Sequence, residues 1–597
     1  MLYASLMPRR LATAALLLAS QAHAADRYPL IQERNVAVGM RDGVVLRADL
    51  YRPDAQGTFP VLLQRTPYDK NNGVAFGLTA AAQGYVVIIE DVRGRYASEG
   101  EWYPFKNEPK DGYDTVEWAA ALRYSNGKVG MFGGSYVGAT QLLAAIAHPP
   151  HLAGICPAVT ASNFHDNWTY QGGAFELWFN ESWTSQLAQD TFNRAVRNHT
   201  NALGGIARLP LTEVAILPSR QPLAEFARTA SAAPYLLDWL DHPAYDDYWR
   251  RISVEEHFSD ITIPALHIAA WYDIFLGGSL RNYLGIKSHG GSEEARRGQR
   301  LWVAVGGHAG NGPRIGSRDF GPASNFDADA TSLRWYDYLF KGIQNEFATG
   351  KPVRIFVLGA NRWRDEDDWP LARAKVTRYF LHSRGAGGAA RGASAHGGNG
   401  SLSTVAPADE RPDEYVYDPR DAVQTIGGPL CCEALSTGIG PQDQRPAEER
   451  RDVLVYTTAT FAKDTEVTGP VSLDLYVSSS AVDTDFTGML VDVWPDGFAQ
   501  NLTSGILRLR YRRSQEKPEP AIPGKPYRIE LDLWATSNVF LAGHKLRLEV
   551  SSSNFPRFDR NLNMGEEQAY ATRMIQARNV VYHDRARPSA LIVPIVP

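Results

Sequence analysis

Residues 127–147 read Gly127-Lys-Val-Gly-Met-Phe-Gly-Gly-Ser135-Tyr-Val-Gly-Ala-Thr-Gln-Leu-Leu-Ala-Ala-Ile-Ala147, and this run carries the strongest structural signal in the chain. A short apolar segment at 129–132 is followed by glycines, one serine and a series of alanines and leucines. That order predicts a buried strand, a tight turn and a helix, with the Ser135 hydroxyl held exposed at the carboxyl edge of a parallel sheet. The pattern departs from G-x-S-x-G, because the next glycine is Gly138, three residues after the serine. A Gly-Ser turn of this kind also occurs without any function, so other parts of the chain must supply the evidence.

Strand-like and helix-like segments alternate on both sides of this run. A helix is expected at 114–122. The alternation predicts an α/β fold with a parallel sheet that helices cover on both faces. Strands are expected at 44–51, 60–64, 85–89, 152–159, 263–270 and 301–305.

A segment of different character interrupts this pattern at 161–254. Aromatic and polar residues there recur at helical spacing, as in Phe179 and Trp183, and strand-like runs are absent. We therefore predict a helical cap inserted between two parts of an α/β core, 25–160 and 255–352.

The last part of the chain, 353–597, has an all-β texture. Its short alternating segments are separated by turns rich in Gly, Pro and Asp, which predicts a jelly-roll β-sandwich domain. The Gly/Ala-rich stretch at 385–400 is expected to be a loop. Arginines alternate along 508–513 as on one strand face, and a solvated sheet edge explains them better than nucleic-acid binding. Strands are expected at 354–358, 453–456, 471–477, 490–493, 527–533 and 545–550.

The first 24 residues have the features of an export signal. Arg9 and Arg10 precede an apolar run at 11–19, and Ala22-His23-Ala24 provides a small-x-small cleavage site. The apolar run is too short to span a bilayer, and no later stretch reaches that length. We therefore predict an exported protein, periplasmic or secreted, without a membrane span. The formal net charge of −5 argues against a nucleic-acid partner.

The cysteines do not make a disulfide framework. They are Cys156, Cys431 and Cys432, and the last two are adjacent. A bond between neighbours requires a distorted peptide, so two separate thiols are expected and a vicinal disulfide is the alternative. The His and Cys residues show no metal-ligand spacing, so we predict no metal site and no cofactor.

A serine nucleophile requires a base to accept its proton and an acid to orient that base. In α/β hydrolases these residues follow the serine in the order acid, then histidine, each at the carboxyl end of a strand. Asp273 and His308 each follow an expected strand in that order. The predicted catalytic residues are therefore Ser135, Asp273 and His308, with His289 as a reserve base. The alternatives are a helix cap for Asp273 and a glycine-loop histidine without a role for His308.

The chain also carries a series of short motifs in a fixed order: Met40-Arg-Asp-Gly43, Arg65-Thr-Pro-Tyr68, Asp91-Val-Arg-Gly-Arg95, Ser98-Glu-Gly100, Asp111-Gly-Tyr-Asp114, Gly134-Ser-Tyr136, Trp271-Tyr-Asp273, Asp483-Thr-Asp-Phe486, Pro495-Asp-Gly497 and Gly543-His544. With this series the chain resembles the CocE/NonD hydrolase family, which includes cocaine esterase-like enzymes and relatives of Xaa-Pro dipeptidyl peptidases. The resemblance extends over nearly all of the chain after the predicted signal.

The resemblance implies an α/β-hydrolase core with a helical cap, a C-terminal jelly roll and a Ser135–His308–Asp273 triad. It also implies an oxyanion hole made by the Tyr68 hydroxyl and the backbone N–H of Tyr136, two fixed donors where negative charge develops. The chain departs from the family pattern before the base. Two glycines directly precede His308, where family members commonly carry Gly-Pro-Trp and one further residue.

These features predict a serine hydrolase that cleaves the ester or amide bond of a small-molecule ester, amide or peptide substrate through an acyl-enzyme. Related α-amino acid ester hydrolases carry a glutamate two residues after the serine and an acidic run after the aspartate. This chain has Val137 and Ile274-Phe275 there, so an uncharged acyl pocket is expected. The residues expected to line it are Phe164, Trp168, Trp178 and Phe275.

Two other functions are compatible with the sequence. An exopeptidase of the Xaa-Pro dipeptidyl-peptidase type requires a carboxylate near the catalytic residues to bind the substrate ammonium. Asp166, Glu176 and Glu181 in the predicted cap are candidates for that carboxylate. The alternative of another class is a non-catalytic protein that binds sugars or surfaces through its jelly roll, and the complete set of candidate catalytic residues argues against it.

Overall fold

The computed structural model describes residues 27–197, 233–308, 310, 312–384, 400–432, 435–566 and 568–597. The predicted signal peptide at 1–24 and residues 385–399 of the Gly/Ala-rich stretch lie outside the described residues. The described chain forms an α/β unit, a cap and a β-rich C-terminal unit.

A ten-stranded sheet with the order β1-β2-β4-β3-β5-β6-β9-β10-β13-β14 forms the centre of the α/β unit. The neighbours from β4 to β13 pair in parallel, and β1, β2 and β14 join the edges as antiparallel strands. The predicted α/β fold is thereby confirmed. The bounds are β1 (Leu30–Gly39), β2 (Val45–Pro53), β3 (Phe59–Thr66), β4 (Val86–Asp91), β5 (Ser125–Gly134), β6 (Leu152–Ala158), β9 (Ala265–Tyr272), β10 (Gln299–Gly307), β13 (Val353–Val357) and β14 (Arg362–Glu366).

Helices cover both faces of this sheet, because alternate strand residues are apolar on each side. Helices α2 (Glu108–Ala120) and α3 (Tyr136–Ala145) pack into one core cluster, to which α9 (Leu276–His289) adds Ile286. Helices α1 (Val74–Ala82) and α11 (Ala328–Lys341) pack into a second cluster on the opposite face. Helix α2 begins six residues before the expected start at 114, since a proline in its first turn is compatible with a helix start.

The described parts of the cap, 161–197 and 233–254, are helical, as predicted, and carry a short hairpin that the sequence did not indicate. Strands β7 (Tyr170–Gln171) and β8 (Ala174–Phe175) flank two glycines with positive φ, a turn that favours glycine. The described helices of the cap are α4 (Leu177–Arg197), α7 (Pro234–Asp241) and α8 (Asp247–Arg250).

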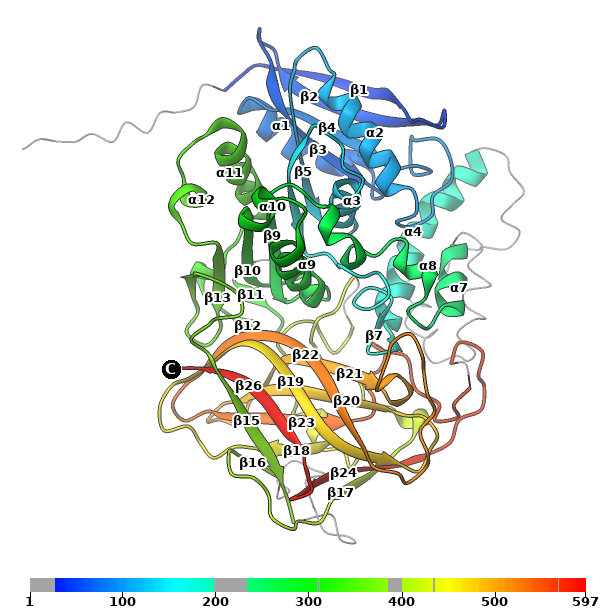
Figure 1. Cartoon of the computed structure of the whole chain (residues 1–597), viewed down its shortest axis with the longest axis vertical. Helices are drawn as coiled ribbons and strands as arrows, with labels where there is room; N and C mark the ends of the chain where they lie inside the picture. Colours follow the sequence, from blue (N-terminus) through cyan, green and yellow to red (C-terminus); the bar gives the residue numbers. More distant parts are fainter. Residues whose placement is uncertain are drawn as a thin grey trace, which may run out of the picture.

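The C-terminal unit is all-β, as predicted, and its twelve strands form one hydrogen-bonded network. Figure 1 shows this unit below the α/β unit, in colours from green (β15) through yellow to red, with α4, α7 and α8 at the side. The strands are β15 (Lys375–His382), β16 (Ser401–Ser403), β17 (Asp413–Tyr417), β18 (Leu454–Thr457), β19 (Thr465–Ser479), β20 (Asp485–Val493), β21 (Ala499–Arg508), β22 (Tyr527–Phe540), β23 (Lys545–Ser551), β24 (Ala577–Asp584), β25 (Arg587–Pro588) and β26 (Ala590–Val596).

The expected strand at 354–358 lies in a different sheet from the one predicted. It is β13, which pairs in parallel with β10 and so extends the α/β sheet, not the jelly roll. A five-residue apolar run looks the same in either setting, because periodicity does not report which sheet a short strand joins.

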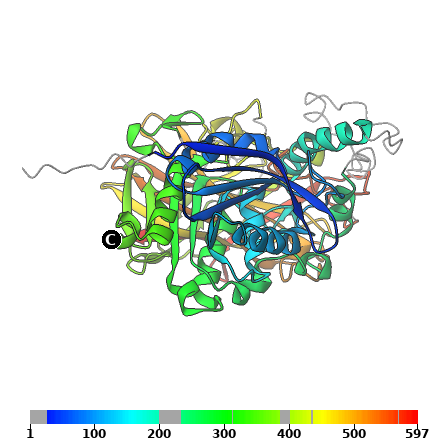
Figure 2. The ribbon, with the colours of Figure 1, turned by 90° about the horizontal axis from the view of Figure 1, so that it is seen from above.

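In the view from above in Figure 2, β1 and β2 cross the top of the α/β unit in blue.

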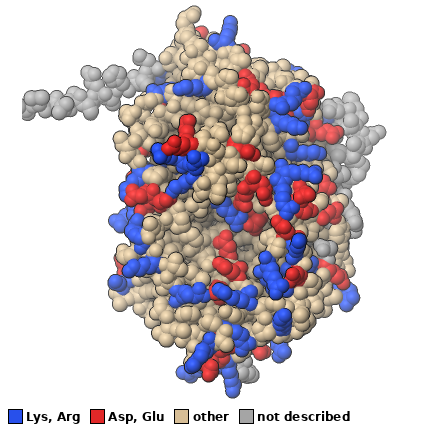
Figure 3. Space-filling model, viewed as in Figure 1, with Lys and Arg blue, Asp and Glu red and all other residues tan. Residues whose placement is uncertain are grey.

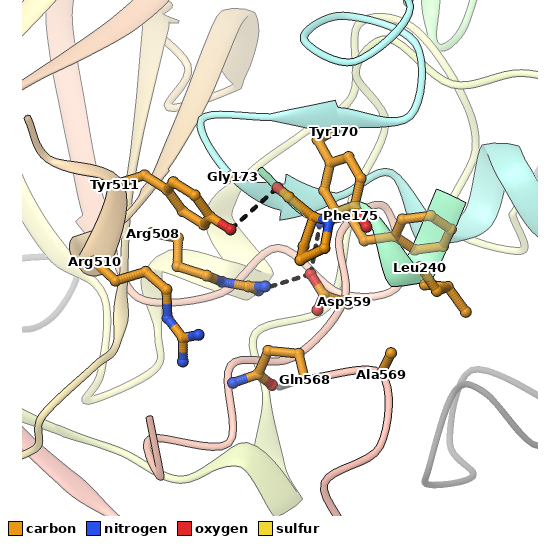
Figure 4. Close-up of a pocket in the computed structure, with 11 residues that line it drawn as sticks. Tyr170, Gly173, Phe175, Leu240, Arg508, Arg510, Tyr511, Asp559, Gln568 and Ala569 are labelled. Carbon is orange, nitrogen blue, oxygen red and sulfur yellow. Dashed lines mark hydrogen bonds and ion pairs between the residues drawn. The ribbon is translucent and has the colours of Figure 1, made fainter. Parts of the chain in front are cut away.

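The expected solvated edge at Arg508 and Arg510 is wrong, because both side chains are buried. Arg508 forms an ion pair with Asp559 (2.7 Å), and Arg510 forms one with Asp483 (2.6 Å). Asp559 also accepts the backbone N–H of Phe175 at 2.8 Å, so this cluster joins the cap to the C-terminal unit (Figure 4). The pairing carboxylates come from distant positions, which a local pattern does not reveal.

Among the described residues, no helix has both the length and the apolar character required to cross a bilayer. On the face shown in Figure 3, basic and acidic side chains are interspersed.

Candidate active site

Ser135 occupies the turn between β5 and α3, at the carboxyl edge of the sheet. Its backbone has φ 62° and ψ −130°, a strained conformation for a residue with a side chain, and it precedes the first turn of α3. A side chain at Gly138 would place its Cβ 2.8 Å from the Cβ of Thr160, so the helix passes close to the next segment only because residue 138 is glycine. The half-buried Ser135 hydroxyl is therefore presented at the helix N-terminus, as the sequence run predicts.

The side chain of Tyr136 fixes the first residue of α3 through hydrogen bonds in the core. Its buried hydroxyl donates to Glu108 Oε1 at 2.9 Å and accepts the backbone N–H of Phe105 at 2.8 Å. Glu108 is held in turn by Arg65, whose Nη1 donates to Glu108 Oε2 at 2.7 Å. The Tyr136 side chain is thus held in the core by these two hydrogen bonds.

The Tyr68 hydroxyl lies where three other groups converge. The Ser135 side chain and the Tyr136 backbone lie close enough to this hydroxyl to lower its pKa. The Tyr68 hydroxyl accepts a hydrogen bond from Trp183 Nε1 at 2.9 Å. Since an indole nitrogen only donates, the phenol oxygen is the acceptor and its own proton is free to point towards the serine. Burial raises the pKa of Tyr68 above its ordinary value, so the hydroxyl is protonated and can donate at neutral pH.

Arg95 secures the segment that carries Tyr68. Its Nε donates to the carbonyl of Pro67 at 3.0 Å, and its Nη1 donates to the carbonyl of Leu187 on α4 at 3.0 Å. The guanidinium therefore joins the Tyr68 turn to the same helix that presents Trp183. The motif around Arg95 marked this residue in the sequence, but nothing there indicated that it supports Tyr68.

Asp273 and His308 meet at the same edge of the sheet, after β9 and β10. His308 Nδ1 lies 2.7 Å from Asp273 Oδ1, and Asp273 is fully buried. The second carboxylate oxygen accepts the backbone N–H of Phe275 at 3.1 Å. Because Nδ1 donates to the carboxylate, Nε2 is the ring nitrogen that can accept a proton.

An aromatic cluster connects the histidine to the tyrosine. The Phe275 ring lies edge-on to His308 at 5.2 Å and is stacked on Trp168 at 4.5 Å. Trp168 contacts Trp183 at 5.5 Å, and Phe164 at 6.0 Å, between ring centroids. Three of the four predicted pocket residues, Phe164, Trp168 and Phe275, therefore belong to one cluster.

Trp178, the fourth predicted pocket residue, lies on another side of α4. It precedes Trp183 by five residues, which places it about 140° around the helix. Its backbone N–H donates to the carbonyl of Pro556 in the C-terminal unit at 3.0 Å. Phe179, four residues before Trp183, has the spacing that puts it on the Trp183 face, and its ring contacts Trp168 and Phe275. The i, i+4 spacing of Phe179 and Trp183 in the sequence is the signal that identifies the side of α4 facing the aromatic cluster.

The reserve base His289 is too far away to act on Ser135. Helix α9 begins three residues after Asp273, and His289 is its exposed last residue. A helix of this length separates its ends by about 20 Å. His308 is thus the histidine that the fold brings to the carboxyl edge.

The three acidic residues considered for an ammonium site differ in their partners. Asp166 forms an ion pair with Arg281 (2.7 Å), and Glu176 forms one with Arg557 (3.5 Å). Glu181 is buried, and this burial raises the pKa of its carboxyl well above the ordinary value. It precedes Trp183 by two residues and therefore lies about 160° around α4 from it.

Cys431 and Cys432 form a disulfide, so the expectation of two separate thiols is wrong. Cys431 is buried and belongs to the extended core cluster that also contains Trp168 and Trp183. Cys156 is a free, buried thiol, and burial raises its pKa to about 12. Among the described residues, no group of three His, Cys, Asp or Glu side chains is placed to hold a metal ion.

Comparison with known proteins places this geometry in a family. Residues 42–310 match the X-Pro dipeptidyl-peptidase (S15) family, and residues 345–592 match the X-Pro dipeptidyl-peptidase C-terminal non-catalytic domain. The chain is 39% identical over 577 residues to a cocaine esterase from Rhodococcus sp. (strain MB1 Bresler), an alignment covering 94% of this chain and 98% of that protein.

Two solved structures share the fold over the whole length. An α-amino acid ester hydrolase aligns with a TM-score of 0.78 at 23% identity, covering 98% of this chain and all of that one. A CocE/NonD family hydrolase from Staphylococcus aureus aligns with a TM-score of 0.68 at 20% identity, covering 95% and 94%.

The fold and these relatives define the protein as an enzyme, a serine hydrolase with an α/β-hydrolase core and a C-terminal β-rich domain. The chain belongs to the CocE/NonD hydrolases, the family of its cocaine esterase relative, and it carries the two domains that X-Pro dipeptidyl-peptidases also have.

Proposed function

We propose that the protein is an exported carboxylesterase or acylase that cleaves small neutral esters or amides through a Ser135 acyl-enzyme. Asp273 orients His308, His308 removes the proton of Ser135, and Tyr68 with the Tyr136 N–H binds the oxyanion. The Asp273–His308 pair carries the proposal, because it leaves Nε2 as the proton acceptor at the sheet edge where β5 presents Ser135.

In the proposed cycle, Ser135 Oγ attacks the substrate carbonyl as its proton passes to His308 Nε2. The carbonyl oxygen becomes an oxyanion that accepts hydrogen bonds from the Tyr68 hydroxyl and the Tyr136 N–H. His308 then gives the proton to the leaving group, and an ester of Ser135 remains. Water enters, loses a proton to the same histidine and releases the acid. Asp273 stays ionised and stabilises the imidazolium at each step.

Replacing Tyr68 by phenylalanine is expected to lower kcat for p-nitrophenyl esters about 10²- to 10³-fold, because one of two oxyanion donors is lost. KM should change little, since the hydroxyl acts mainly in the transition state. Steady-state kinetics measures both constants. A matched control is Tyr85→Phe, which removes a hydroxyl bonded to Asp337 on the opposite sheet face and should leave kcat unchanged. If Tyr68→Phe matches the control, Tyr68 is not an oxyanion donor.

The substrate side of the proposal rests on the absence of a poised carboxylate at the positions considered. Asp166 and Glu176 are held by arginines, and Glu181 lies around α4 from Trp183, whereas the cluster beside Ser135 is aromatic. Ester hydrolysis is also the activity named for the Rhodococcus relative. A substrate with an uncharged acyl group therefore suits the site better than a peptide with a free amino end.

A comparison of p-nitrophenyl butyrate with Gly-Pro-p-nitroanilide tests this preference. We expect kcat/KM to be about 100-fold or more higher for the ester, because the ammonium of the dipeptide finds no ionic partner. Equal or faster cleavage of Gly-Pro-p-nitroanilide would instead support the exopeptidase function.

Export is supported by the signal-like features at 1–24 and by the disulfide, since disulfides persist in oxidising compartments. Sequencing the N-terminus of the mature protein tests export, and a chain that still begins at Met1 would contradict it.

A further inference from the structure

The vicinal disulfide lies beside α4, the helix that carries Trp183. Cys431 is 3% exposed and belongs to the same packed cluster as Trp168, Trp183 and Phe275, and Cys432 packs against that cluster. The two cysteines come from a loop of the C-terminal unit between β17 and β18. They therefore place a covalent constraint of the C-terminal unit beside the cap helix α4.

The base of this loop is itself held closed. The backbone N–H of Gly428 donates to the carbonyl of Gly440 at 2.7 Å, and the reverse hydrogen bond measures 2.9 Å. With its ends joined in this way, the loop can be positioned by a few contacts at its tip. The contacts of Cys431 and Cys432 with the cap are contacts of that kind.

A short chain of contacts links the disulfide to the oxyanion donor. The backbone N–H of Cys432 donates to Ser182 Oγ on α4 at 3.4 Å. The next residue along α4 is Trp183, whose indole donates to the Tyr68 hydroxyl at 2.9 Å. Tyr68 in turn lies close enough to Ser135 for the serine side chain to lower the pKa of its hydroxyl. The Cys432 backbone is thus connected to Trp183 through one hydrogen bond to Ser182 and the peptide bond that follows Ser182. Trp183 is the residue that orients the Tyr68 proton.

We propose that the Cys431–Cys432 disulfide is a positioning element of the active site, and that the enzyme is more active with this bond closed than with it reduced. The proposal rests on the proposed function, since it assigns Tyr68 to the oxyanion hole. The closed bond couples the two cysteine side chains in one unit beside α4, next to Ser182. Two thiols rotate independently and no longer hold the loop tip in one arrangement.

The chemical step is thiol–disulfide exchange with an added dithiol such as dithiothreitol. One dithiol thiolate attacks one cysteine sulfur, the S–S bond of the enzyme breaks, and a mixed disulfide forms. The second thiolate of the reagent then attacks the reagent sulfur of the mixed disulfide and releases the cysteine that was bonded to it. Two enzyme thiols are formed after protonation, and the reagent leaves as its cyclic disulfide, so two electrons pass from the reagent to the protein. Cys156 is buried and its thiol pKa is raised to about 12, which makes it a poor participant.

The test compares oxidised and dithiothreitol-treated enzyme with p-nitrophenyl butyrate, with thiols counted by mass spectrometry after alkylation. We expect reduction to lower kcat about tenfold, since small displacements of a catalytic donor are costly, and reoxidation to restore it. The Cys431→Ser/Cys432→Ser double variant should show the lower kcat and no response to the reagent. Cys156→Ser should respond as the unmodified protein does.

Three results would overturn the proposal. One is an unchanged kcat in enzyme whose two thiols are fully alkylated. Another is full activity in the Cys431→Ser/Cys432→Ser variant. This variant lacks the bond without any reagent, so it tests the proposal even if the native disulfide resists dithiothreitol. The third is a loss of activity that parallels loss of near-UV circular dichroism, because unfolding and not local repositioning would then explain it. Failure of the proposed function is distinguishable, since oxidised enzyme would then neither hydrolyse the ester nor accept a fluorophosphonate label.

Discussion

Ser135→Ala is expected to lower kcat for p-nitrophenyl esters by about 10³- to 10⁶-fold. The change removes the oxygen that forms the acyl-enzyme and leaves the oxyanion donors Tyr68 and the residue 136 amide in place. The residual rate should come from those donors and from substrate binding. Steady-state kinetics measures the loss, and fluorophosphonate labelling should fall to background in the same variant.

The fold should survive this substitution, because Ser135 is half-buried and alanine differs from it by one atom. A melting temperature close to that of the unmodified protein serves as the control. If the well-folded Ser135→Ala protein keeps a tenth or more of the activity, the nucleophile lies elsewhere.

Asp273→Asn is the second change with a very large expected effect, a fall in kcat of about 10⁴-fold, the size known for this substitution in a serine protease triad. One carboxylate oxygen faces His308 Nδ1 at 2.7 Å and the other accepts the N–H of Phe275 at 3.1 Å. An amide keeps the shape, but once its oxygen accepts from Phe275, its NH₂ faces the histidine. The imidazole then carries its proton on Nε2 and cannot accept one from Ser135.

The matched control is Asp365→Asn, which weakens an ion pair with Arg354 at the far edge of the sheet and should leave kcat within twofold. A kcat for Asp273→Asn within tenfold of the unmodified enzyme would remove the Asp273–His308 pair from the mechanism.

Local chain geometry explains why the serine was predictable from the sequence. The strand, glycine turn and helix around Ser135 are all specified within 21 residues, so no distant partner is needed to place the hydroxyl. Asp273 and His308 follow from a different rule, since the carboxyl ends of parallel strands meet at one edge. Their 2.7 Å contact required only that β9 and β10 be neighbours in the sheet.

The features that the sequence did not reveal depend on contacts between distant segments. The run at 354–358 fits either sheet, and only its pairing with β10 assigns it to the α/β unit. Arg508 reads as solvated until Asp559 is found beside it. The side of α4 on which Trp178 lies depends on how the helix is rotated relative to the core. The spacing between Trp178 and Trp183 indicates this rotation, whereas the residue type alone does not.

The disulfide shows the same limit more strongly. Adjacent cysteines carry no signal in the sequence that separates two thiols from a bond, since loop conformation decides the outcome. The role of Trp183 is also invisible there, because it arises from an indole N–H that meets Tyr68, 115 positions away in the chain.

The most direct test of the central claim is a crystal structure of the enzyme after reaction with a fluorophosphonate. We predict a covalent bond to Ser135 Oγ, a phosphonyl oxygen about 2.7–3.1 Å from both Tyr68 Oη and the Tyr136 nitrogen, and His308 Nε2 within hydrogen-bond reach of Ser135 Oγ. Label on another residue, or His308 turned away from Ser135 with no other imidazole in its place, would contradict the mechanism.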